Sequence, residues 1–398
     1  MAIPSISQRG RTTPPSPIRK LAPYADEAKA KGVKVYHLNI GQPDIPTPPE
    51  FYDAIHRFSE DVLSYCPSQG ILRFRQSLKR YYQRIGFRHI QTEDIMVSTG
   101  GSEGVLFSMM AVASPGEEIV TFEPFYPNYN GFTRMAGIKL VPVNTQPETG
   151  YHLPPLEEIE QRITPKTRAI LINSPNNPTG TILTRKEMEG IQTLALRHNL
   201  FVLSDEVYRE FTFDGQPTSI LSFPDLSQHA VLVDSLSKRY SACGARVGCI
   251  VSKNSEVMET VLKFGQARLS SPTLEQVGAS AMVDTGDKYF QDMIQEYKKR
   301  RDTIFEGLTK IPGVRCKKPE GAFYLMVTFP VNDIENFSKW LLTDFSVDGE
   351  TTMMAPGPGF YATPGRGKQE ARIAYVLNTE DLKKATRILE EGLSAYNK

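Results

Sequence analysis

A lysine and an arginine lie among small residues in the stretch DSLSKRYSACGARVG, residues 234–248. The stretch follows HAVLV, an apolar run typical of a buried strand. Lys238 and Arg246 have two interpretations. They form either a solvated surface at a strand end or part of a closed pocket in which the lysine does covalent chemistry. A neutral lysine amine forms an imine with an aldehyde, and a neighbouring arginine binds phosphate.

Other polar residues follow other apolar runs of the chain. They are Gly101 and Ser102 after IMVSTG, Tyr126 after EEIVTFEPF, Asn177 after RAILINSPN, Asp205 and Tyr208 in SDEVY, and Ser235 after HAVLVD. Ligands of open parallel sheets bind outside the carboxyl ends of the strands, so we expect these residues to share one sheet edge. A glycine turn, an aromatic ring, an amide, a carboxylate and a lysine suit a flat, anionic ligand that contains nitrogen.

Each of these residues also has a plain structural interpretation. The Gly-Gly-Ser turn at 100–102 is compatible with a tight strand–helix turn as well as with an anion at a helix N-terminus. Tyr126 taken alone is typical of a core aromatic residue, and NNPTG at 176–180 forms a turn on either interpretation. Asp205 either caps a helix or meets a cation, because an isolated buried carboxylate is costly to desolvate.

Taken together, the residues favour one cofactor. The Gly-Gly-Ser turn, Ser235 and Arg246 can hold a phosphate. Lys238 can bind an aldehyde, and Asp205 can face a ring nitrogen. Pyridoxal 5′-phosphate carries these three groups on one flat pyridine ring. The pattern therefore predicts a pyridoxal-phosphate enzyme.

Short apolar runs alternate with helix-length segments between about residues 95 and 250, which predicts an α/β fold with a mostly parallel sheet flanked by helices. A long helix is predicted at 286–310, and strands at 314–329 and 371–377 follow it. Asn378 is the predicted N-cap of a closing helix from Thr379 to Tyr396. We expect an N-terminal arm and the start of a small domain in 1–45. The large cofactor-binding domain is expected in 46–285 and the small C-terminal α+β domain in 286–398.

Composition narrows the class of protein. The chain has 398 residues, 40% hydrophobic and 23% charged, with a formal net charge of +1, so a nucleic acid or a membrane as main partner has no compositional support. The four cysteines show no spacing typical of a metal site and indicate reduced thiols, so we expect no metal and a cytoplasmic location. The first twenty residues faintly resemble a transit peptide, but their prolines favour a structural arm.

The sequence resembles the class I aminotransferases, which have the aspartate aminotransferase fold. The resemblance runs from GQPD at 41–44 to ARIAYVL at 371–377 and includes GGSEG, NNPTG, SDEVY, PEGAFY and SLSK followed eight residues later by arginine. It implies that Lys238 binds the cofactor covalently and then acts as the catalytic base, with Asp205 at the ring nitrogen. Asn177 and Tyr208 would face the ring hydroxyl, and Tyr126 would stack on the ring. The resemblance also assigns the phosphate group to the residues Gly101, Ser102, Ser235 and Arg246.

Further positions carry over from the same family. Arg372 in ARIAY matches the arginine that binds the substrate α-carboxylate, with Asn177 beside it. Ile40 and Gly41 match the segment that closes over the substrate. Tyr65 in YCPSQG matches a tyrosine that reaches into the neighbouring subunit, which implies a homodimer with shared active sites.

The substrate is less clearly indicated. Ser102 stands where one family branch has a lysine for the distal carboxylate, and Arg268 is near, but out of register with, an arginine that another branch uses. The alternative for Arg268 is interface structure. Aspartate with 2-oxoglutarate is the first expectation, followed by alanine, aromatic or branched-chain amino acids. A pyridoxal-phosphate lyase or synthase and a non-catalytic regulatory module are the competing classes.

Overall fold

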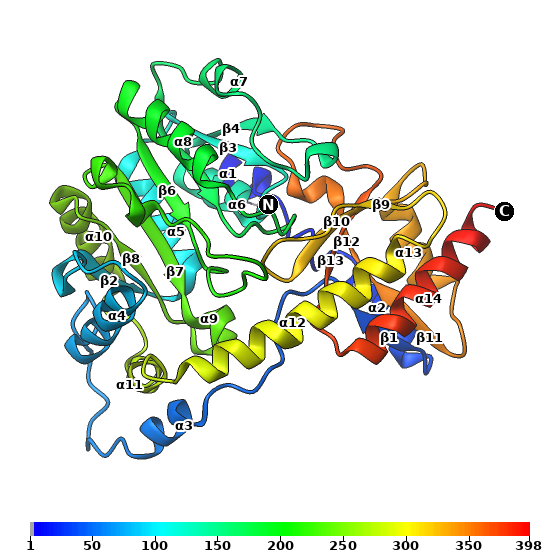
Figure 1. Cartoon of the computed structure of the whole chain (residues 1–398), viewed down its shortest axis with the longest axis horizontal. Coiled ribbons are helices and arrows are strands. Elements are labelled where there is room, and N and C mark those ends of the chain that lie inside the picture. Colours follow the sequence, from blue (N-terminus) through cyan, green and yellow to red (C-terminus); the bar gives the residue numbers. More distant parts are fainter. Residues whose placement is uncertain (1–3) are drawn as a thin grey trace.

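The computed structural model describes residues 4–398 (Figure 1). The α-helices are α1 Gln8–Thr12, α2 Ala22–Ala30, α3 Pro49–His56, α4 Leu72–Arg84, α5 Gly100–Val112, α6 Asn128–Ala136, α7 Leu156–Glu160, α8 Arg185–Arg197, α9 Leu236–Arg239, α10 Ser255–Arg268, α11 Thr273–Met282, α12 Asp287–Leu308, α13 Ile334–Thr343 and α14 Thr379–Tyr396. The strands are β1 Lys34–His37, β2 Ile95–Ser98, β3 Glu118–Glu123, β4 Lys139–Asn144, β5 Thr167–Asn173, β6 Phe201–Asp205, β7 Ala230–Ser235, β8 Gly248–Val251, β9 Arg315–Cys316, β10 Tyr324–Thr328, β11 Glu350–Met353, β12 Ala355–Pro356 and β13 Glu370–Ala374.

The main sheet has seven strands in the order β2-β8-β7-β6-β5-β3-β4. The pairs β7–β6, β6–β5, β5–β3 and β3–β4 are parallel, whereas β8 runs antiparallel to both of its neighbours. The predicted α/β class with a mostly parallel sheet is confirmed. The predicted element pattern did not include β4 or β8: β4 is interrupted by a proline and half-buried, and β8 is only four residues long.

Both faces of the main sheet are covered. Along β7, Val231 and Val233 pack with α5, α6 and α10, whereas Leu232 between them packs on the opposite face with residues of α8. Successive side chains of a strand point to opposite faces, so a strand buried on both sides must be apolar at every position. This is why the strands read as continuous apolar runs in the sequence.

Two smaller sheets lie beside the main one. One is antiparallel, in the order β12-β13-β10-β9, and the other pairs β1 in parallel with β11. The long helix α12 extends from near α9 to these sheets, and Figure 1 shows it in yellow. The predicted closing helix is present, with the Asn378 side chain accepting a hydrogen bond from the Asp381 backbone N–H. The division at residues 45 and 285 stays a prediction.

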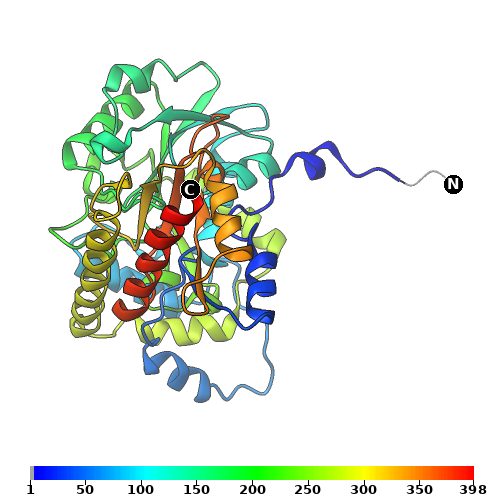
Figure 2. The same cartoon turned by 90° about the vertical axis from the view of Figure 1, so that its right-hand side faces the viewer.

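The N-terminal stretch is loosely attached at α1, which approaches α6, and is packed more closely from Pro17 to the start of α2. Figure 2 shows the blue start of the chain extending away from the body, and no residue of α1 is buried. Leu21, directly before α2, is buried beside Met353 of β11. Among residues 4–398, no helix is long and apolar enough to cross a membrane. The same residues contain no cluster of three or more His, Cys, Asp or Glu arranged to hold a metal ion.

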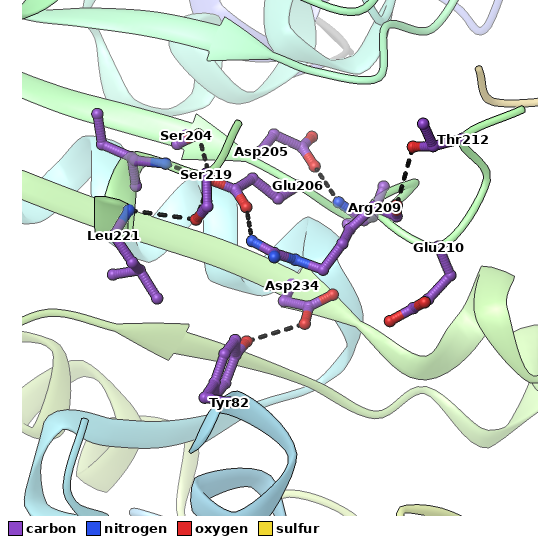
Figure 3. A network of polar contacts seen from close by, with 12 residues as sticks. Tyr82, Ser204, Asp205, Glu206, Arg209, Glu210, Thr212, Ser219, Leu221 and Asp234 are labelled. Atoms are coloured by element: carbon purple, nitrogen blue, oxygen red, sulfur yellow. Dashed lines mark hydrogen bonds and ion pairs between the residues drawn. The ribbon is translucent and has the colours of Figure 1, made fainter. Parts of the chain in front are cut away.

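A network of buried ion pairs underlies the ends of β6 and β7 (Figure 3). The Glu206 carboxylate accepts hydrogen bonds from Ser204 Oγ and Ser219 Oγ, both at 3.0 Å, and pairs with Arg209. Asp234 accepts a hydrogen bond from Tyr82 Oη at 2.8 Å and pairs with Arg239, which is also buried. Each of these buried charges has an opposite charge and hydrogen-bond partners, which is the condition for tolerating it in a core.

We expect Asp234→Asn to lower the free energy of unfolding by about 3–5 kcal/mol, because it leaves the buried Arg239 guanidinium with only the more distant Glu210 carboxylate at 3.9 Å. Urea unfolding followed by circular dichroism measures the change. Glu391→Gln is the matched control, since it removes an exposed pair with Arg387 and is expected to cost less than about 1 kcal/mol. Similar losses in the two variants would contradict the account of the network.

Candidate active site

One cavity of about 660 Å³ opens at the edge where β2, β5, β6 and β7 end. The four-stranded antiparallel sheet contributes its other side through Tyr324 on β10 and Arg372 on β13. Twelve of the thirteen residues assigned to the site from sequence line it, and they are Ile40, Gly41, Gly101, Ser102, Tyr126, Asn177, Asp205, Tyr208, Ser235, Lys238, Arg246 and Arg372. Residues far apart in the sequence therefore meet where the parallel sheet predicts a ligand.

A cationic cradle lies at the N-terminus of α5. Gly100 has a φ of +72°, and a Cβ added to it would lie 2.5 Å from an Arg246 Nη atom, so the arginine is packed onto the helix start. Ser235 Oγ lies beside this turn and accepts a hydrogen bond from the Ser237 backbone N–H at 3.1 Å. Free backbone N–H groups, the helix dipole and a guanidinium together favour an anion, and a phosphate suits them best.

Asp205 is a buried carboxylate with neutral partners. It is 5% exposed, and its Oδ2 accepts a hydrogen bond from Tyr129 Oη at 2.7 Å. Its Oδ1 accepts one from the Val207 backbone N–H at 3.3 Å. Burial raises the pKa of Asp205 to about 6. No cation among residues 4–398 forms an ion pair with it, and it caps no helix. The site therefore suits a cationic group brought by a ligand.

Arg372 is a buried cation, whereas Asp205 is a buried anion. It lies on β13, is 1% exposed, and has no acidic partner within the described part of the chain. Its guanidinium donates to Asn177 Oδ1 at 2.9 Å and to the Asn39 carbonyl, and it lies 4.4 Å from the centre of the Tyr324 ring. Its Nε has no hydrogen-bond partner, and burial lowers the pKa of the group. A buried cation held in a fixed orientation without an anion is prepared for an anionic ligand.

Lys238 reaches the same cavity from α9. Its Nζ donates a hydrogen bond to the Gly41 carbonyl at 2.8 Å and lies 3.8 Å from Cys243 Sγ. It forms no ion pair with a carboxylate of residues 4–398. The amine is therefore held by neutral partners, and one of them, Gly41, lies in the segment predicted to close over the substrate.

Neutral polar groups line the wall between the charges. Asn177 Nδ2 donates to Tyr208 Oη at 3.4 Å, and Tyr208 Oη lies 3.0 Å from Tyr324 Oη. Tyr126 is half-buried, with Asn128 Nδ2 donating to its hydroxyl at 2.7 Å, and burial raises its pKa to about 12. Burial also raises the pKa of Tyr208, so Tyr126 and Tyr208 stay neutral and act as hydrogen-bonding and stacking surfaces.

Sequence reasoning missed several residues that line the cavity, and Tyr324 and Asn173 are two of them. Tyr324 ends PEGAFY, and its hydroxyl lies so close to Gly41 that any side chain there would overlap it. Asn173 lines the cavity, donates to the Asp205 carbonyl at 2.9 Å and accepts from the Asn177 backbone N–H at 2.7 Å. The signal for Asn173 was its place at the end of an apolar strand, where other site residues were sought.

Two predicted residues lie outside the cavity of their own chain. Tyr65 is 79% exposed, and its role in a neighbouring subunit stays a prediction. Arg268 Nε lies 3.3 Å from Glu103, and its Nη1 donates to Ser271 Oγ at 2.6 Å. Its charge is therefore already partnered, and contact with a substrate stays a prediction as well.

The residues fit pyridoxal 5′-phosphate. An anion cradle, a buried carboxylate without a cation and a lysine without a carboxylate are the three groups that its phosphate, ring nitrogen and aldehyde require. Arg372 remains for a substrate carboxylate.

Comparison with known proteins agrees with this geometry. Residues 33–389 match the family model for aminotransferases of class I and II. An aspartate aminotransferase of Sulfolobus acidocaldarius is 30% identical over 92% of each chain. The structure of a single mutant of Thermus thermophilus aspartate aminotransferase superposes with a TM-score of 0.88 at 27% identity, over 98% of this chain and 100% of that one. The Pyrococcus furiosus alanine aminotransferase gives 0.89 at 28% identity, with the same coverage. The chain therefore belongs to the class I and II aminotransferases, the enzymes with the aspartate aminotransferase fold.

Proposed function

We propose that this aminotransferase uses pyridoxal 5′-phosphate to move the amino group of an L-amino acid to a 2-oxo acid, most directly from aspartate to 2-oxoglutarate, by a ping-pong mechanism. The observation that carries the proposal is that two buried charges, Asp205 and Arg372, have no ion-pair partner among residues 4–398 and lie in one cavity with Lys238. The aspartate aminotransferases among the similar proteins support the choice of aspartate.

Each residue has a defined part in binding the cofactor. Gly101, Ser102, Ser235 and Arg246 would hold the phosphate group, and Asp205 would keep a proton on the ring nitrogen. Asn177 and Tyr208 would hydrogen-bond the ring hydroxyl, and Tyr126 would stack on the ring. The bound cofactor supplies an electron sink conjugated to the substrate Cα.

The remaining residues would act on the substrate. Arg372 binds the α-carboxylate with its planar fork, because its Nε is free and its orientation is fixed by Asn177 and Asn39. The Lys238 amine, once released, would take the proton from Cα of the amino acid. In the second half-reaction it would deliver a proton to Cα of the new amino acid. Ile40 and Gly41 exclude water above it, since the Gly41 carbonyl already contacts the amine.

We also propose that two chains form the working enzyme. Tyr65 lies in a stretch with exposed apolar neighbours, Val62 at 68% and Leu63 at 59% exposure. Burying such side chains against a second copy is favourable, and it would bring Tyr65 to the phosphate group of the partner's cofactor.

Lys238→Ala is expected to lose covalent attachment of the cofactor and to reduce turnover by at least about 1000-fold. Borohydride reduction followed by mass spectrometry detects attachment, and the 2-oxo acid product measures turnover. Lys263→Ala is the control, because Lys263 is an exposed lysine of α10 outside the cavity. Unchanged turnover in Lys238→Ala would refute the assignment.

Asp205→Asn is expected to stabilise the cofactor-free protein at pH 8 by up to about 3 kcal/mol, at 1.36 kcal/mol for each pKa unit. Burial raises the pKa of Asp205 from 3.8 to about 6, so its ionisation weakens the fold. This penalty is absent below about pH 4 and complete above about pH 6, so the wild-type protein and the variant should converge in acid. Urea unfolding of the two proteins at pH 8 and below about pH 4 measures this difference in stability.

The same substitution is expected to have the opposite effect on cofactor binding. A neutral asparagine amide cannot balance a protonated ring nitrogen, so pyridoxal phosphate should dissociate more readily from Asp205→Asn at pH 8. A variant that is less stable without the cofactor yet retains it as well as the wild-type protein would contradict both expectations.

A third comparison separates a transaminase from a lyase on the same scaffold. After L-aspartate has consumed the lysine-bound form of the cofactor, 2-oxoglutarate should restore its visible absorption band. A lyase would release its product without needing the oxo acid. If L-alanine or an aromatic amino acid alone consumes the band, the amino donor changes while the reaction class stays.

A further inference from the structure

Four cationic side chains line the cavity, against one carboxylate. They are Arg19, Lys238, Arg246 and Arg372, and the carboxylate is Asp205. None of the four forms an ion pair with an acidic group of residues 4–398. Under the proposed function the cofactor aldehyde binds to Lys238, the cofactor phosphate binds to Arg246 and the substrate α-carboxylate binds to Arg372. Arg19 is left without a partner.

The backbone that carries Arg19 is firmly seated. Pro17 packs so closely on Gly359 that any side chain at the glycine position would overlap the proline ring. The Ile18 side chain packs against a cluster that contains Phe360 and Tyr361. The Arg19 backbone N–H donates to the Ser16 carbonyl at 3.2 Å. The arm therefore presents Arg19 from a fixed base, while its side chain is exposed and free to meet a ligand.

This base is tied to the residue that would bind the α-carboxylate. Asn39 is 1% exposed, and its Nδ2 donates to the Ile18 carbonyl at 2.9 Å. The carbonyl of the same residue accepts a hydrogen bond from the Arg372 guanidinium. One buried residue therefore fixes the two arginine-bearing segments relative to each other. Both arginines line the same cavity, with a fixed connection between their backbones.

The other candidates for a second carboxylate are already committed. Ser102 carries no charge, and Arg268 pairs with Glu103 outside the cavity. Arg246 lies at the start of α5, where the phosphate is expected. We infer that Arg19 is the specificity residue that binds the distal carboxylate of a dicarboxylic amino or 2-oxo acid. The inference rests on the proposed function, because it takes the α-carboxylate to be bound at Arg372.

Because Arg19 is exposed, it affects the affinity for dicarboxylates more than the affinity for monocarboxylates. A monocarboxylic substrate leaves the guanidinium hydrated, and no buried charge is stranded. Arg19 therefore raises the affinity for dicarboxylates without excluding smaller substrates. Its loss should change binding and KM, whereas the rate of proton transfer at Cα should stay the same.

The test compares Arg19→Gln and Arg19→Lys in the cofactor-loaded enzyme. Arg11→Gln is the matched control, since Arg11 is an exposed arginine of the same arm outside the cavity. Calorimetry measures the Kd of succinate, an unreactive dicarboxylate, and of propionate, its monocarboxylate counterpart. Stopped-flow half-reactions with L-aspartate and L-alanine measure KM and kcat separately.

Arg19→Gln should weaken succinate binding by about 10- to 100-fold, the value of a lost charge-assisted hydrogen bond, and leave propionate unchanged. KM for aspartate should rise with kcat retained, and Arg19→Lys should recover part of the loss. Equal weakening of both ligands, or no change in succinate binding, would overturn the inference. So would a wild-type enzyme that binds succinate no tighter than propionate.

Different results would refute the proposed function and the role of Arg19. A wild-type protein that transfers no amino group from any amino acid would refute the proposed function. An active enzyme whose Arg19→Gln variant binds succinate normally would refute only the role of Arg19. Calorimetry reads succinate binding whether or not turnover occurs.

Discussion

Two buried charges of opposite sign, neither of which has an ionic partner among residues 4–398, are the constraint on which the site depends. Asp205 ends a strand of the main sheet, and Arg372 lies in the antiparallel sheet. Burial shifts the pKa of each group toward its neutral form, so the charged form of each is costly until a ligand neutralises it. A ligand with a cationic ring nitrogen and a carboxylate relieves both costs, and binding energy is thereby concentrated where the chemistry occurs.

The ion pairs directly behind the site show that this fold can satisfy buried charges when they serve structure. Glu206 follows Asp205 in sequence, and Asp234 precedes Ser235, yet both carboxylates are paired and hydrogen-bonded (Figure 3). Alternation along the strands sends one carboxylate into the paired network and its neighbour into the cavity. The network also connects the ends of β6 and β7, which carry Asp205 and Ser235.

Sequence reasoning located most of the site because the parallel sheet gathers residues at the ends of apolar runs. Asp205, Asn177 and Lys238 were predictable in this way, and the family resemblance then assigned their roles. Residues held by long-range packing were not predictable. Arg19 reaches the cavity only because Asn39 and Gly359 seat its arm. The ionic partner of Arg268 was not predictable from the sequence, because only the folded chain brings Glu103 beside it. The antiparallel strand β8 was too short to recognise.

The most direct test of the central claim is a titration of the cofactor-free protein with pyridoxal phosphate, followed by its visible absorption. The account predicts a saturable band from a single lysine-bound cofactor per chain, which L-aspartate consumes and 2-oxoglutarate restores. A protein that forms no such band at any cofactor concentration would contradict the claim that Asp205, Lys238 and the α5 cradle form a cofactor site.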